Sequence, residues 1–281
     1  MTRTNLFGEK YYKEKFDYNI THELTEINPE KISIDFVTMS EISYIQPKIS
    51  KAIWRVAPGR NIGIVVKHKD VFIGAIALVS PVIILGVRDE YLGLSSDKSE
   101  KGSQLKNYAD MSVCVGLQPL SWYWNIGKLI ALLATSKEVK DFYYSKYGNE
   151  LLGITTTSLY GKGCQYNRIY KFLGYTKGYG HEHITEEKYQ DMIQYMRDNN
   201  IDVPSCRFGE GSNPRMRRIS AYKKATGESF TFKHGKKRGV YYHPSTDKSI
   251  TEISRDWYNR WGYSRYQRKK GDIPPYLDGK K

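Results

Sequence analysis

The sequence predicts a mixed α/β or α+β core of about 200 residues, followed by a basic, aromatic-rich C-terminal extension. Three observations predict this class. Residues 62–79 have the composition of a strand pair, and residues 112–160 alternate between strand-like and helix-like segments. Positive charge is concentrated near the C-terminal end. We therefore divide the chain into a polar lead-in, a core domain and a nucleic-acid-binding extension, over 1–30, 31–200 and 201–281 respectively.

The N-terminal part of the core is predicted to supply three strands. Residues 32–40, ISIDFVTMS, have strand composition, and residues 40–58 read as a helix or an irregular segment that ends before a Pro-Gly pair. β-Branched and apolar residues then predict strands at 62–67 and 71–79. The polar residues at 68–70 predict the hairpin turn between them.

The middle of the core is predicted to continue with loop, strand, helix and strand. Polar residues 88–109 predict a loop, and we expect the part from Ser95 to Ser103 to be mobile. A strand is expected at 112–117, followed by helical sequence over 127–147 that forms one helix or two. Consecutive threonines disfavour a helix, so residues 150–160 are predicted to form a further strand.

Two helices are predicted near the end of the core. Residues 165–172 predict a short helix stopped by Gly174, followed by a strand or loop at 175–184. Residues 185–200 begin with a threonine N-cap and early glutamates and carry apolar residues three or four positions apart, which predicts an amphipathic helix. In the extension, residues 222–244 resemble a hairpin module.

The composition also argues against several classes of protein. Cys114, Cys164 and Cys206 have no paired spacing, so neither a disulfide framework nor a cysteine zinc site is expected. His181 and His183 stand two residues apart without a carboxylate partner, and we predict no metal site. The N-terminus is polar and the apolar runs are interrupted, so we expect a cytoplasmic protein with no membrane partner.

The formal charge is +14 and is unevenly distributed. Residues 207–281 contain 19 Lys and Arg against 7 Asp and Glu, interleaved with tyrosine and tryptophan. Cations neutralise phosphates and aromatic rings stack on bases, so the pattern predicts nucleic acid as a partner, and the family resemblance given below implies double-stranded DNA. A solvated basic tail is the alternative interpretation. The predicted DNA contacts are Arg88, Trp122, Trp124, Arg215, Arg217, Arg218, Lys236, Lys237, Arg238, Arg265, Arg268, Lys269 and Lys270.

The stretch SVCVGLQPLSWYWNIGKLIALLATS, residues 112–136, runs from a strand into a helix through Gly127 and Lys128. Unpaired N–H groups and the helix dipole favour an anion at such a helix start, and glycine allows close approach. The turn therefore predicts phosphate binding. An ordinary strand-to-helix turn is the alternative.

The order of these segments resembles the GNAT N-acyltransferase fold, which has a mixed, splayed central sheet. The segments are VFIGAIAL, SVCVGLQP, WNIGKLIALL, ITTTSLY and NRIYKFLGY. The resemblance implies that the turn holds the pyrophosphate of a donor, usually coenzyme A, and it places Tyr170 as a general acid. The identity of the donor stays open: an acyl or aminoacyl compound is expected, and a donor of coenzyme A type is one candidate. The residues implied to hold it are Gln118, Ser121, Asn125, Gly127 and Lys128.

A closer resemblance covers roughly residues 40–185. The segments SPVIILGVRDEYLGLSS, NYADMSVCVGLQPLSWYWNIGKLIALLA and YGNELLGITTTSLYGKGCQYNRIYKFLGYTKGYG are similar to the Mom family of phage DNA-modification proteins. The relatives of that family include the DruA component of Druantia anti-phage systems. The resemblance implies transfer of a carbamoylmethyl-like group to the N6 amine of adenine, which protects phage DNA from restriction.

A second class of function stays open beside this enzyme. The middle glycine of the donor-binding motif and a His-Tyr pair before the hairpin, both found in relatives, are missing here. Their absence favours a catalytically idle, DNA-binding component of a phage defence or counter-defence system.

Four residues are candidates for proton handling at the adenine amine: Asp89, Tyr91, Asp110 and Tyr170. The lone pair of N6 is delocalised, so transfer requires a carboxylate or phenol close to the amine. Three of these candidates also have a structural interpretation. Asp89 could pair with Arg88 to brace the loop, Asp110 could cap a turn, and Tyr170 could be a core residue.

Overall fold

The computed structural model describes residues 26–50, 59–159, 161–162, 164–181, 184, 186–207, 214–228 and 233–272. These form two compact units. The first contains the described residues up to Lys177 and resumes at Arg238, and the second spans Gly178–Lys237. The extension predicted from residue 201 onward is thus shared between the two units, with the change at Arg238.

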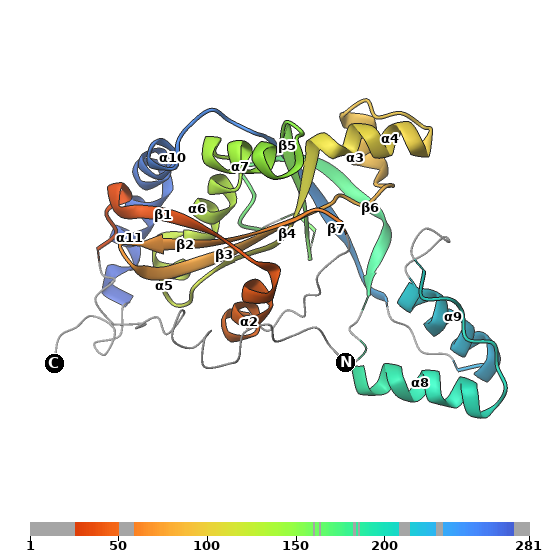
Figure 1. The fold of residues 1–281 in the computed structure, drawn as a ribbon. Helices are drawn as coiled ribbons and strands as arrows, with labels where there is room; N and C mark the ends of the chain where they lie inside the picture. The colour runs from red at the N-terminus through yellow and green to blue at the C-terminus, as the bar shows by residue number, and fades with distance from the viewer. Residues whose placement is uncertain are drawn as a thin grey trace. The chain divides into compact units, whose positions relative to one another are not determined.

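A seven-stranded mixed sheet forms the centre of the first unit, so the mixed α/β class is confirmed (Figure 1). The strand order is β1-β2-β3-β4-β5-β7-β6. The pairs β1–β2, β2–β3, β3–β4 and β5–β7 are antiparallel, and β4–β5 is parallel. The predicted hairpin is β2–β3. The strands are β1 (Ile32–Val37), β2 (Asn61–His68), β3 (Val71–Val79), β4 (Tyr108–Gly116), β5 (Gly153–Ser158), β6 (Lys171–His181) and β7 (Lys233–Pro244).

The sheet opens between its two parallel strands. β4 and β5 pair only from Tyr108 to Asp110, opposite Gly153 to Thr155. β4 continues to Gly116, and β5 continues to Ser158 while pairing with β7 on its other edge. Beyond Asp110 the two strands therefore diverge, and Asp110 lies at the fork. This fork positions the candidate site described below.

Helices cover both faces of the sheet (Figure 1). Helices α6, α7 and α10 contribute to the larger hydrophobic core, together with Ile64 of β2, whereas α2 packs on the opposite face against Val65. Gly74 of β3 allows close contact with the first group, because a Cβ there would lie 2.0 Å from Ile130 Cδ1. The helices are α2 (Met39–Ile49), α3 (Gly86–Tyr91), α4 (Lys98–Gln104), α5 (Leu120–Trp124), α6 (Ile126–Leu133), α7 (Lys137–Tyr147), α8 (Glu186–Asp198), α9 (Pro214–Thr226), α10 (Ile250–Trp257) and α11 (Tyr263–Lys269).

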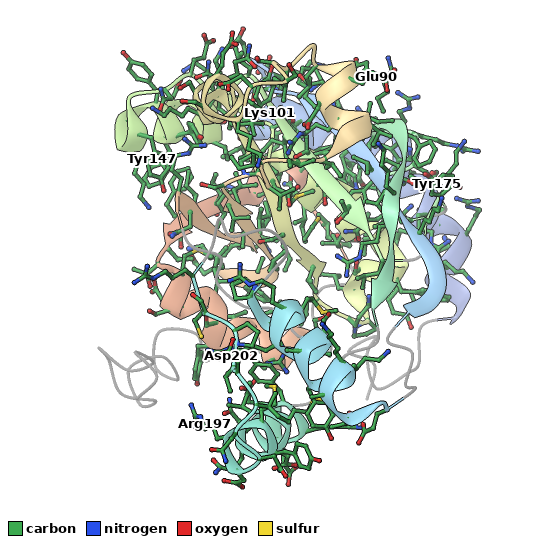
Figure 2. The ribbon with its side chains drawn as sticks, turned by 90° about the vertical axis from the view of Figure 1, so that its right-hand side faces the viewer. Glu90, Lys101, Tyr147, Tyr175, Arg197 and Asp202 are labelled. Atoms are coloured by element: carbon green, nitrogen blue, oxygen red, sulfur yellow. The ribbon has the colours of Figure 1, made fainter. Side chains whose placement is uncertain are left out.

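The prediction of a loop that is mobile at 95–103 is wrong. The structure has helix α3 before this segment and helix α4 over Lys98–Gln104. Asp97 caps α4 by accepting hydrogen bonds from the N–H groups of Ser99 and Glu100. The Lys101 ammonium of α4 donates to Asp89 of α3 at 3.0 Å, which joins the two helices. Figure 2 shows them together, marked by Lys101 on α4 and Glu90 on α3.

The prediction of a short helix at 165–172 is also wrong. Its first part is a series of turns, and β6 begins at Lys171. Arg168 has a φ of 69°, in the left-handed region, which interrupts a right-handed helix. Gly174, expected to stop the helix, lies inside β6.

Two other boundaries differ from the prediction. The strand expected at 32–40 ends at Val37, because Thr38 and Glu41 form a capping box that begins α2. The hairpin expected at 222–244 is replaced by the end of α9 and by β7, and residues 229–232 lie outside the described part.

The second unit contains the amphipathic helix predicted at 185–200, observed as α8. Its apolar face packs on α9 through a cluster that includes Met192, Met196 and Ile219. The three-to-four spacing of apolar residues placed Met192 and Met196 on one face of α8, as predicted. Within the described residues of the chain, no helix has the length and apolar character required to cross a bilayer.

Candidate functional site

A cavity of about 580 Å³ lies in the first unit at the fork between β4 and β5. One wall is β4 from Asp110 to Val115, and the other is the end of β5 with the segment that follows it. Among the described residues, Arg238 of β7 and two residues of the α2 region also line the cavity. We call this cavity the fork cleft. Its lining is Gln46, Ser50, Asp110, Met111, Ser112, Val113, Cys114, Val115, Thr157, Ser158, Leu159, Gly161, Cys164, Gln165, Tyr166 and Arg238.

Asp110 is the carboxylate of the fork cleft. Burial raises its pKa to about 6, although the Thr155 hydrogen bond and the charges of Arg88 and Arg238 oppose the rise. The Thr155 hydroxyl donates to Asp110 Oδ1 at 3.1 Å. A carboxyl group with a pKa near 6 exchanges protons close to neutral pH, as a general acid or base must.

Arg238 brings positive charge into the same cleft. Its backbone N–H donates to Thr176 Oγ1 at 3.2 Å, which fixes the start of this part of β7. Its side-chain Nε is shielded from solvent and has no hydrogen-bond partner among the described atoms. The structure thus places a predicted DNA contact beside a predicted catalytic carboxylate.

The turn before α6 is closed by partners from the chain itself. The Gly127 N–H donates to Ser121 Oγ at 3.2 Å, and the Lys128 ammonium donates to the carbonyls of Gln165 and Asn167 at 2.8 and 2.6 Å. A Cβ at Gly127 would lie 2.2 Å from Gln165 Oε1. The close approach that this glycine permits is therefore made by Gln165.

The other implied donor-binding residues lie around this turn. Asn125 separates α5 from α6 with a left-handed φ of 56°, and its carbonyl accepts from Trp257 Nε1 at 3.2 Å. Gln118 is exposed and forms a cis peptide with Pro119.

Tyr170 is a core residue in this structure. It is buried, and its hydroxyl donates to the Ala131 carbonyl at the end of α6 at 2.8 Å. Burial raises the pKa of this phenol well above its ordinary value. The core interpretation of Tyr170 therefore agrees with its surroundings better than the role of general acid.

Arg88, Asp89 and Lys101 form a buried ionic cluster under α3. Arg88 is fully buried, and it donates to Asp89 Oδ1 and to the Val82 carbonyl. Burial acts to raise the pKa of Asp89, but hydrogen bonds from Arg88, the Leu85 N–H and Lys101 outweigh it and lower the pKa. These contacts agree with the bracing interpretation of Arg88 and Asp89, and full burial leaves Arg88 no exposed surface for DNA contact.

Tyr91 lies at the end of α3 and is 44% exposed. Its ring is 4.3 Å from Lys171 Nζ and 5.5 Å from the ring of Tyr242 on β7. Tyr242 is also 6.5 Å from Tyr108, next to the fork. Tyr91 therefore belongs to a tyrosine cluster at the paired end of β4.

Helices α5 and α11 form a cationic, aromatic surface on the first unit. Trp122 is 41% exposed, and Arg265 donates to its carbonyl at 2.9 Å. The Arg265 guanidinium and the Lys269 ammonium lie 5.3 and 4.2 Å from the Trp122 ring centroid. Arg268 and Lys270 are exposed on the same segment. We call these five residues the α5–α11 surface.

Trp124, the other predicted tryptophan, is buried and stacks on Tyr266 with ring centroids 4.2 Å apart. Its ring joins α11 to the core, so the predicted DNA contact is incorrect for this residue. The neighbours Trp122 and Trp124 thus have different roles because they point to opposite sides of α5.

Three arginines at the start of α9 are predicted to contact DNA. In the structure their side chains contact other residues of the second unit. Arg215 donates to Glu186 and to the Ile184 carbonyl. Arg217 donates to the Ser205 and Arg207 carbonyls, and Arg218 to that of Pro204. Lys237 is exposed, whereas the side chain of Lys236 lies outside the described part.

Sequence reasoning missed the cleft roles of Arg238, Thr155 and Gln165. Thr155 was visible only as a strand residue, and Arg238 only as one cation in a basic run. Charge density carries no information on which single arginine turns inward. Only the pairing of β5 with both β4 and β7 brings Thr155 and Arg238 to Asp110.

The fold and site define a mixed α/β protein with an open sheet, a carboxylate in a cleft and a separate cationic, aromatic surface. Residues 7–255 match the family described as Druantia protein DruA, and the chain therefore belongs to the DruA family.

One curated relative is the Druantia protein DruA of Escherichia coli (strain UMEA 4076-1), 34% identical over 190 residues. The match covers 60% of this chain and 46% of the relative, so the chain spans about half of that protein. No solved structure matches the chain.

Proposed function

We propose that this chain modifies DNA, transferring a small acyl-type group to the N6 amine of adenine in the fork cleft. The observation that carries the proposal is Asp110, a carboxyl group with a pKa of about 6 at the fork of two parallel strands. Splayed parallel strands beside a catalytic cleft also support the resemblance to a GNAT-like core. DruA membership supports a place in the conflict between phage and bacterium, inside the bacterial cytoplasm.

Asp110 would act as the general base. As the N6–C bond forms, Asp110 accepts a proton from N6, and the leaving group departs from the donor with the electrons of the broken bond. The base must leave the duplex to reach the cleft. Tyr91 and Tyr242, whose rings lie 5.5 Å apart beside the fork, offer aromatic faces for it.

The α5–α11 surface supports DNA as the substrate. Its cations would neutralise phosphates, and the exposed Trp122 ring would stack on a base or sugar. Two segments far apart in the sequence build this surface through the hydrogen bond from Arg265 to Trp122. Binding would release counterions from the DNA phosphates, so the affinity of the protein for DNA would fall as salt is added.

A second candidate is a DNA-binding component of a defence system without catalysis. The internal partners of Gly127 and Lys128 favour it, because the helix start expected to hold a donor is already satisfied. The buried hydroxyl of Tyr170 favours it as well.

Mass spectrometry of nucleosides separates the two candidates. The chain is expressed in a bacterium, and host and plasmid DNA are digested and searched for a heavier deoxyadenosine. We expect one with the natural sequence and with Asp141→Asn, an exposed surface control, and none with Asp110→Asn. An unchanged nucleoside profile for the natural sequence, with DNA binding retained, would instead establish the binding component.

A further inference from the structure

We infer that the fork cleft contains a binding site for a small oxyanion, a carboxylate or phosphate group, with Arg238 as the residue that holds it. This inference concerns ligand binding alone and does not depend on the proposed reaction.

The state of Arg238 is the first argument. Its Nε is shielded from solvent without a hydrogen-bond partner, although its backbone is anchored to Thr176. Because protein atoms cover Nε, an entering ligand would meet the terminal nitrogens of this guanidinium, for which no hydrogen bond is present among the described residues, and a charge-assisted acceptor there would be bound favourably. No ion pair joins Arg238 to Asp110 within the described part of the chain, and Asp110 accepts from Thr155.

The other polar groups of the cleft point to Arg238 as its anion-binding group. Gln165 Nε2 donates to the Cys114 carbonyl at 2.9 Å, and the Ser158 hydroxyl donates to the Gly161 carbonyl. Among the described lining residues, Arg238 is the positively charged one. An acceptor entering the cleft would therefore meet Arg238.

The shape of the guanidinium selects the ligand class. The guanidinium is planar, and its terminal N–H groups form a fork that matches two oxygens of a carboxylate or phosphate. The cavity of about 580 Å³ is larger than a single ion, so it would take a small metabolite that carries the anionic group. A phosphate of a nucleic acid strand has the same chemistry and is the competing source.

Asp110 makes the binding depend on pH. Charged Asp110 would repel an anion at Arg238, and protonated Asp110 would not. The other titratable groups lining the cleft are Cys114, Cys164 and Tyr166, and burial raises the pKa of Cys114 and of Tyr166 so that both stay neutral. Buried Arg88 adds a constant positive charge from α3. Affinity should therefore fall as pH rises through about 6.

The test follows the arginine Nε–Hε resonances of the full chain by NMR during titration with sodium acetate or sodium phosphate, at constant ionic strength. We expect one resonance to shift and saturate, and to be missing in Arg238→Lys. Isothermal titration calorimetry, which does not depend on the Arg238 resonance, should show the dissociation constant increasing roughly tenfold or more in Arg238→Lys and Arg238→Gln. Arg197→Gln, which removes an exposed charge from α8, should leave the dissociation constant unchanged.

Two further arms decide the outcome. Asp110→Asn should bind acetate as tightly at pH 8 as the natural chain does at pH 5. Arg238→Lys keeps the positive charge and removes only the guanidinium shape. If this variant loses affinity while the rest of its NMR spectrum is unchanged, the loss is not caused by misfolding. If neither anion shifts the resonance and only a short oligonucleotide does, the site is a strand-phosphate contact and the small-ligand inference is overturned. Equal weakening by Arg197→Gln would overturn it too.

Discussion

Substitution of Tyr170 by phenylalanine tests whether this residue supports the core or donates a proton. The Tyr170 hydroxyl donates to the Ala131 carbonyl, near the end of α6, at 2.8 Å. Tyr170→Phe removes that donor inside the core and leaves a buried carbonyl without it. Loss of such a partner costs about 1–3 kcal/mol, so we expect the free energy of unfolding to fall by about that amount.

Urea denaturation followed by tryptophan fluorescence measures this change. Tyr144→Phe is the control, because Tyr144 is 62% exposed on α7 and its substitution should alter stability by less than about 0.5 kcal/mol. DNA modification by Tyr170→Phe should persist below its unfolding midpoint. Equal stability of the two variants, together with loss of modification in Tyr170→Phe alone, would show that Tyr170 is the general acid and refute the core interpretation.

Three other predictions address packing, charge and DNA binding. Gly74→Ala should lower stability by about 1–3 kcal/mol in urea denaturation, since its Cβ would meet Ile130 at 2.0 Å. The pKa of Asp110 is raised from 3.8 to about 6, so its ionisation opposes folding as pH rises across that window; Asp110→Asn should therefore stabilise the protein at pH 8, by about 1–3 kcal/mol, and have little such effect at pH 3.5. Trp122→Ala should weaken DNA binding by about 1–3 kcal/mol in fluorescence anisotropy with stability retained, whereas Trp124→Ala should cost about 3–5 kcal/mol of stability; the reverse pattern would contradict the assignment of Trp122 to the surface.

Much of the architecture was readable because its signals are local. The hairpin β2–β3 followed from β-branched runs around a polar turn, and α8 from apolar residues three or four positions apart. The errors arose where one contact overrode composition. Polar residues 98–104 form a helix because Asp97 caps it and Lys101 reaches Asp89, and a left-handed Arg168 prevents the short helix expected after Gln165.

The sequence by itself determined the class of the fold, the strand-to-helix order and the excess of positive charge near the C-terminal end, because periodicity, capping and charge are carried by neighbouring residues. Only the tertiary structure decided which functional side chains meet. It buried Trp124 and Tyr170, exposed Trp122, and set Arg238 beside Asp110. The burial of these side chains depends on pairing between strands that are far apart in the sequence. That pairing determines which polar groups are removed from water and which hydrogen-bond partners they have.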